Sequence, residues 1–145
     1  MDEPTINDMM IAYADDAVEF AKSKFNIELD YSSESIKCVE DIAARLYASI
    51  PRSLFGKIFK AGPSDKEIDI VCKMLGGYIG EVYRKIRPGE WGVHEQFGAI
   101  GIKHEDSWFF PPAKVHKRLS NGEEDNLSYF FSVALDQLGK HAAGT

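Results

Sequence analysis

The sequence predicts a single α+β domain over residues 1–145, with helices packed on a small three-stranded antiparallel meander in the order α-α-α-β-β-β-α-α. Three observations indicate this fold class. Apolar residues recur at helical spacing before residue 88 and again after residue 112, whereas short apolar runs alternate with polar turns between them. A chain of 145 residues has the length of one domain. No repeat, low-complexity tract or linker divides it.

Two amphipathic helices open the predicted fold. The first covers residues 5–25, with Thr5 as its N-cap, and an alternating stretch after it predicts a short extended connector. The second begins at Ser32 or Ser33, and Pro51 ends it because proline lacks the amide hydrogen. The apolar face of the first helix is Ile6, Met9, Met10, Tyr13, Ala17, Phe20 and Ala21, and that of the second is Ile36, Val39, Ile42, Ala43, Leu46 and Ile50.

Residues 52–63 allow two interpretations. Their large apolar residues, Leu54, Phe55, Ile58 and Phe59, are interleaved with lysines and flanked by glycines. We expect a short amphipathic turn folded onto the core. The alternative is a mobile flap that carries exposed aromatic side chains.

The third helix has the strongest pattern in the chain. Ser64 and Glu67 form a capping box, and the apolar period then holds until a Pro-Gly pair ends the helix. Inside it stand Gly76, Gly77 and Gly80, each of which costs about 1 kcal/mol relative to alanine. Three such losses in one helix predict that another segment packs very close against it.

Short apolar runs predict the three strands. They cover residues 91–93, 97–102 and 108–110, and polar turns at 94–96 and 103–106 separate them. Their lengths and the shortness of the turns favour an antiparallel meander.

Two helices complete the predicted fold. Pro111 and Pro112 begin a short helix through Leu119, and Gly122 ends it. The last helix turns its apolar residues inward and has an acidic run at its positive N-terminal end. The apolar residues are Leu127, Phe130, Phe131, Ala134, Leu135 and Leu138, and the acidic run is Glu123, Glu124 and Asp125.

Negative charge is concentrated in the first third of the chain. The net charge is −6, and residues 1–41 hold 11 acidic and 3 basic groups. Such a region attracts a basic partner protein, whereas the alternative is that these are the solvated faces of two helices. A pI of 5.2 argues against nucleic-acid binding, which needs a surplus of Lys and Arg. The candidate contact residues are Asp8, Asp15, Asp16, Glu19, Glu34, Glu40 and Asp41.

The sequence predicts a cytoplasmic protein without a membrane partner. It shows no secretory signal, and no apolar run reaches the ~18 residues that a bilayer span requires. Cys38 and Cys72 lie beside apolar positions of two predicted helices, so we expect buried free thiols rather than a disulfide.

No pattern indicates a metal or a cofactor, and we predict neither. The four histidines, His94, His104, His116 and His141, are too scattered for zinc ligands, and the chain has no Cys-x-x-Cys or Gly-x-Ser-x-Gly motif. Since no catalytic residue stands out, an enzyme is the less favoured interpretation.

Glu81 is the one residue that suggests a specific interaction. It is a carboxylate in a glycine-rich, otherwise apolar stretch, and a buried carboxylate requires a partner. We predict a structural ion pair with Lys117 or Arg118 in preference to a general acid–base role. The alternative function, a small-ligand-binding or enzymatic domain, predicts a pocket between the third helix and the sheet. Its candidate lining residues are Glu81, Trp91, His94, Trp108 and His116.

Several motifs between about residues 28 and 131 resemble those of a family of small bacterial domains of unknown function. The motifs are LDYSSESI (29–36), GYIGEV (77–82), GEWG (89–92), FP (110–111) and KVHKRLSNGEED (114–125). The resemblance implies no catalytic residue. Similar small acidic bacterial domains often serve as immunity proteins against toxins, so the resemblance implies a binding protein whose partner is a basic toxin. Either a monomer or a homodimer, the latter through residues 54–59, is compatible with the sequence.

Overall fold

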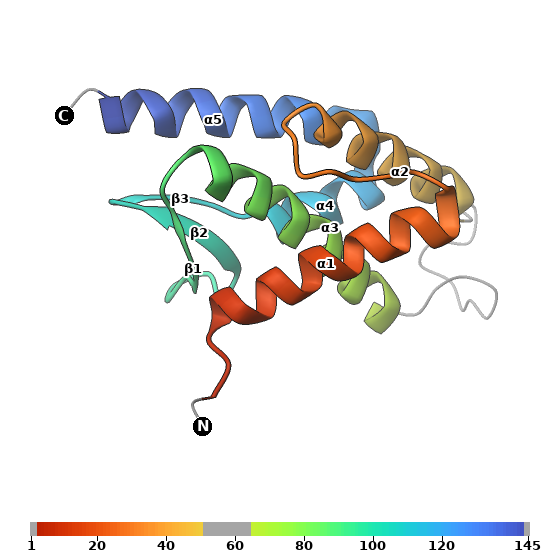
Figure 1. The fold of residues 1–145 in the computed structure, drawn as a ribbon, viewed down its shortest axis with the longest axis horizontal. Helices are drawn as coiled ribbons and strands as arrows, with labels where there is room; N and C mark the ends of the chain where they lie inside the picture. The colour runs from red at the N-terminus through yellow and green to blue at the C-terminus, as the bar shows by residue number, and fades with distance from the viewer. Residues whose placement is uncertain (1–2, 51–64, 144–145) are drawn as a thin grey trace.

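The computed structural model describes residues 3–50 and 65–143, and it confirms the predicted fold class and order of elements (Figure 1). Residues 52–63 and the capping-box residue Ser64 lie outside the described part. The helices are α1 (Ile6–Phe25), α2 (Ser35–Ser49), α3 (Asp65–Ile86), α4 (Pro111–Asn121) and α5 (Leu127–Ala143), the strands are β1 (Glu90–Val93), β2 (Ile100–His104) and β3 (Ser107–Phe109), and a 3₁₀ turn covers Glu123–Asp125.

Helix α3 is the central element, and its glycines explain why. A methyl group on Gly76 would lie 2.5 Å from the Pro112 backbone of α4, and one on Gly77 would lie 3.0 Å from a carbonyl oxygen of α1. A methyl group on Gly80 would collide with the Trp91 ring of β1. The prediction of close packing is therefore confirmed. Three separate segments, α4, α1 and the sheet, each use one of the glycines.

The predicted N-terminal cap of α1 is confirmed. Thr5 Oγ1 accepts a hydrogen bond from the Asp8 amide at 3.1 Å, and Asp8 Oδ2 accepts one from the Thr5 amide at 3.0 Å. Ahead of α2, Ser32 Oγ accepts a hydrogen bond from the Ser35 amide at 3.2 Å. Ser32 therefore stabilises the turn that precedes α2, whereas the N-cap is Glu34, whose side chain makes no capping hydrogen bond, so the predicted cap of this helix is wrong.

The sheet is antiparallel in the order β1-β2-β3, and it lies at one end of the helices with β1 toward α1 and β3 toward α5 (Figure 1). Trp91, Ile102 and Phe109 stand opposite one another on the three strands. All three side chains are buried, and Phe109 meets the Tyr83 ring of α3 edge-on at 4.7 Å. This row therefore forms the inner face of the sheet.

The middle strand begins later than predicted. Phe97, Gly98 and Ala99 belong to a turn, because His94 accepts a hydrogen bond from the Gly98 amide at 2.8 Å and donates one to Ala99 at 3.0 Å. Gly98 has a φ of 64°, which glycine adopts without strain. The strand instead continues through His104, which was predicted in a turn.

The acidic run before α5 does not form the N-terminal turn of that helix, as was predicted. Its residues form the separate 3₁₀ turn, and α5 starts afterwards at Leu127. The Leu127 amide donates to Glu40 Oε1 of α2 at 2.8 Å. A carboxylate from a distant helix therefore occupies the position that was predicted for Glu123, Glu124 and Asp125.

Both cysteines are free, with Cys72 buried and Cys38 half-buried, so the predicted burial is complete only for Cys72. None of the described helices is long and apolar enough to cross a membrane.

Candidate binding surface

The outer face of the sheet has two glycines at its centre, Gly92 and Gly101, which we call the glycine floor. Gly92 and Gly101 stand opposite each other on β1 and β2, and they point away from the inner face because side chains alternate along a strand. A methyl group on Gly92 would lie 3.3 Å from the Trp108 ring, and one on Gly101 would lie 2.5 Å from the Phe110 ring. The two rings therefore rest directly on the strands. They are parallel within 8°, with centroids 5.8 Å apart.

Two residues of the turn after β1 extend this arrangement. His94 stacks on Phe97 at 4.3 Å and meets Trp108 edge-on at 5.0 Å. The ring nitrogen Nδ1 of His94 accepts the amides of Gln96 and Phe97 at 3.2 and 3.3 Å, which fixes the ring in place. We call His94, Phe97, Trp108 and Phe110 the aromatic cluster. Phe97 is 68% exposed, so the cluster presents an apolar surface to solvent.

Two hollows lie beside the cluster along β3. One, of about 500 Å³, runs along Ser107 and Trp108 against α5. The other, of about 460 Å³, lies between Phe97 and α4. Phe109 and Phe130 line both hollows and separate them, with ring centroids 5.8 Å apart.

The charged side chains that line these hollows are lysines. Lys114 and Lys117, one turn apart on α4, line the second hollow. Lys114 is ion-paired with Asp125 at 2.7 Å, and this hydrogen bond holds the pKa of the Asp125 carboxyl below its ordinary value. Lys117 is exposed and forms no ion pair with a residue in the described ranges. The second hollow is thus apolar with one available positive charge.

The predicted ion pair of Glu81 is wrong. Its Oε2 accepts hydrogen bonds from Arg84 at 2.7 Å and from the Trp91 indole nitrogen at 2.8 Å, not from Lys117 or Arg118. Arg84 is one turn away on the same helix, and Gly80 allows the indole to cross α3 beside the carboxylate. Glu81 therefore joins α3 to β1.

The predicted partner Arg118 is buried and pairs with Glu40. Arg118 is 1% exposed, and its Nε and Nη2 donate to the Glu40 carboxylate at 3.0 and 2.8 Å. The assignment of Glu40 to an acidic contact surface is therefore wrong as well. It is an inward-facing residue that binds α4 and, through Leu127, α5.

No hollow given for the described residues is lined by all five predicted pocket residues. Glu81 and Trp91 contact each other at the α3–β1 junction, whereas His94 and Trp108 belong to the aromatic cluster. His116 is exposed on α4 and lines a different hollow of about 240 Å³. The tertiary structure therefore places these five residues at three separate sites.

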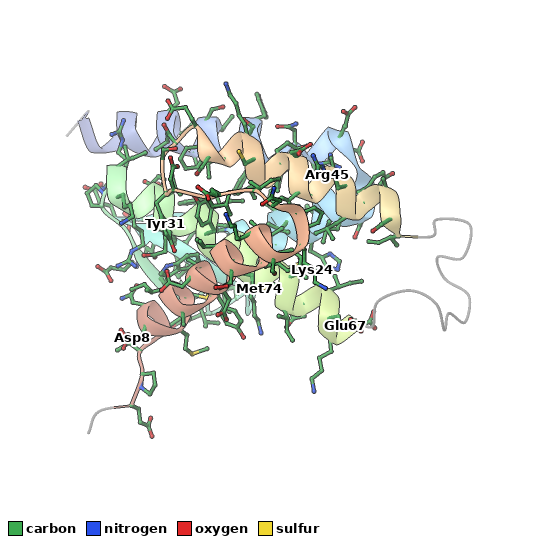
Figure 2. The ribbon with its side chains drawn as sticks, turned by 45° about the vertical axis from the view of Figure 1, so that its right-hand side comes forward. Asp8, Lys24, Tyr31, Arg45, Glu67 and Met74 are labelled. Atoms are coloured by element: carbon green, nitrogen blue, oxygen red, sulfur yellow. The ribbon has the colours of Figure 1, made fainter. Side chains whose placement is uncertain are left out.

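The other predicted acidic residues are on the surface. Asp8, Asp15, Asp16 and Glu19 lie on the exposed side of α1, opposite its buried alanines, and Figure 2 shows Asp8 at the start of this helix. Asp15 accepts a hydrogen bond from the Tyr31 hydroxyl at 2.7 Å. On α2, the exposed Asp41 is paired with its neighbour Arg45 at 3.0 Å, and Glu34 is exposed at the start of the helix.

The resembling motifs meet one another in the structure. Tyr31, which lies between α1 and α2 in Figure 2, donates its amide to the Tyr78 hydroxyl at 2.7 Å, and that hydroxyl also contacts Ser35 Oγ at 2.6 Å. This joins the motif at 29–36 to the motif at 77–82. The Glu81–Trp91 bond joins the motif at 77–82 to the motif at 89–92. These motif residues hold the elements together.

Sequence reasoning missed Phe97 and Phe110 as surface residues, because both belong to apolar runs that predict strands. The signal that could have found them is the pair of glycines at 92 and 101, each an even number of residues from its strand neighbours on one face, which leaves room on that face for large rings. Among the residues that the structure describes, no three His, Cys, Asp or Glu side chains gather as metal ligands. Comparison with protein families, curated proteins and solved structures finds no significant match for this chain.

Proposed function

We propose that this chain is a bacterial cytoplasmic protein-binding domain that acts by occupying a partner's surface, and that the aromatic cluster is the centre of its interface. The exposed cluster is the observation that carries the proposal. Four rings lie together at the outer face of the sheet. Burial of aromatic surface is favourable, yet the fold leaves these rings partly exposed to solvent.

The chemistry of the cluster fits a protein interface. Aromatic residues are enriched at the centres of interfaces, where they bury much area at little entropic cost. Covering the exposed part of Phe97 alone is worth about 1–2 kcal/mol. The glycine floor and the bonds to His94 Nδ1 hold the rings in place before a partner arrives, so little order remains to be imposed on binding.

Site-specific photo-crosslinking tests the proposal. A photoreactive phenylalanine analogue replaces Phe97 in one variant and Tyr129, which is 72% exposed on α5, in a control variant. Both are expressed in the source organism and irradiated. We expect one protein to crosslink at position 97 and not at position 129. The purified partner should then bind the Phe97→Ser variant at least tenfold more weakly than the parent chain. Equal crosslinking patterns at the two positions would refute the proposal.

A second candidate surface is the exposed side of α1, and a basic partner of the toxin type is what it would meet. Four carboxylates on one helix face support this candidate. Its test is the association rate of the purified partner at increasing salt. We expect the rate to fall steeply with salt, and Asp16→Asn with Glu19→Gln should flatten that dependence. A rate that is independent of salt would exclude this surface.

A further inference from the structure

The two edges of the sheet differ. At β1, Asn7 of α1 closes the edge, because its Oδ1 accepts the Trp91 amide at 3.1 Å and its Nδ2 donates to Glu90 at 2.8 Å. Among the described residues, strand β3 is the other edge of the sheet and pairs only with β2. An edge strand with free backbone groups is a template for another strand.

The register shows which backbone groups of β3 face outward. His104 and Ser107 flank a two-residue turn, so they form a hydrogen-bonded pair, and the next pair, Lys103 and Trp108, is non-hydrogen-bonded. The N–H and C=O of Trp108 therefore point away from β2. The same alternation directs the Trp91 amide outward at β1, where Asn7 binds it.

The hollows lie in succession along this edge. The first is beside Ser107 and Trp108, the second lies past Phe109 toward α4, and the contact between Phe109 and Phe130 stands between them. An extended segment beside Trp108 would place apolar side chains in both hollows. Lys117 also lines the second hollow, whereas Lys114, which lines it too, is ion-paired with Asp125.

We infer that the open edge of β3 binds an extended segment of the partner protein by strand addition, and that this segment has apolar residues at its hollow-facing positions and an acidic side chain beside Lys117. The inference rests on the proposed function and specifies the partner's chemistry. Main-chain hydrogen bonds to Trp108 supply affinity, and the hollows with Lys117 supply specificity.

A library of phage-displayed 12-residue peptides is the probe. Selection on the full chain should enrich sequences in which apolar residues alternate with polar ones and an Asp or Glu follows. Enrichment of proline-rich or helical sequences, or of none, would overturn the inference.

Two matched variants then test the mode of binding by fluorescence anisotropy with the enriched peptides. Trp108→Ala removes the ring and keeps the outward amide, whereas Trp108→Pro removes both and leaves the β2–β3 bonds intact. We expect Trp108→Pro to bind roughly fivefold to tenfold more weakly than Trp108→Ala. Equal affinities would overturn strand addition.

Lys117→Glu provides an independent measurement at an exposed position, and its circular-dichroism spectrum and melting temperature are compared with those of the parent chain. The affinity for acidic peptides should fall about tenfold, and the affinity for the same peptides with Asn or Gln in place of the acidic residue should not change. An unchanged affinity for the acidic peptides would overturn the role of Lys117. If crosslinking at position 97 succeeds while these variants bind like the parent chain, the strand-addition inference fails and the proposed function stands.

Discussion

Removal of the Glu40 carboxylate should cost more stability than removal of any other acidic group that the sequence places near it. Glu40→Ala leaves the Arg118 guanidinium, which is 1% exposed, without its counter-charge, and it leaves the Leu127 amide without an acceptor. Breaking one side of a buried pair costs about 3–5 kcal/mol, because the remaining charge stays buried and uncompensated. The total free energy of unfolding of a typical domain is only about 5–15 kcal/mol. For a chain of this size we expect the melting temperature to fall by roughly 10 °C or more.

Asp41→Asn is the matched control, since Asp41 is the next residue on the same helix. Its ion pair with Arg45 has both side chains about half exposed, and such pairs contribute about 0–1 kcal/mol. Urea unfolding followed by circular dichroism gives both changes in free energy. Replacement of Glu40 and Arg118 together by Met should recover most of the loss, because no unpaired charge remains. If Glu40→Ala and Asp41→Asn have equal effects, the assignment of a buried pair is refuted.

The remaining predictions concern packing, pH and thiol reactivity. Gly80→Ala should destabilise the fold by about 1–3 kcal/mol in urea unfolding despite the better helix propensity of alanine, and Trp91→Phe in the same chain should recover part of this, since it removes the colliding ring atoms. Hydrogen bonds from Lys114 and Asn121 lower the pKa of Asp125 below 3.8. The ionised carboxylate therefore stabilises the folded chain above that pH, and this contribution is lost as the pH falls through the lowered pKa. In this acid range the melting temperature of Asp125→Asn should fall less with pH than that of the parent chain. Burial raises the pKa of the Cys72 thiol to about 12, so mass spectrometry should find it unmodified by iodoacetamide at pH 8 until urea unfolds the chain, and modification in the native state would contradict its burial.

The sequence by itself determined the elements whose cause is local. The period of α1 and the oxygen of Thr5 act within one helical turn, so the helix and its cap follow from neighbouring residues. The glycines of α3 also indicated close packing, because a costly residue type in a helix needs a compensating contact. The strands were located by their apolar runs, although the turn at Gly98 shifted the start of β2.

Only the tertiary structure decided which side chains meet. The helical period places Glu40 beside Ile36 and Ala43 on the apolar face of α2 and Asp41 on the other side. Glu40 and Arg118 are 78 positions apart, however, so no local pattern identifies Arg118 as the partner. Glu81 was recognised as a carboxylate in need of a partner, yet the partner depended on how Trp91 crosses α3. The aromatic cluster arises in the same way. Apolar runs do not tell which face of a sheet a helix will cover, and here the helices cover the side of Trp91, Ile102 and Phe109 and leave the glycine-floored side to the solvent.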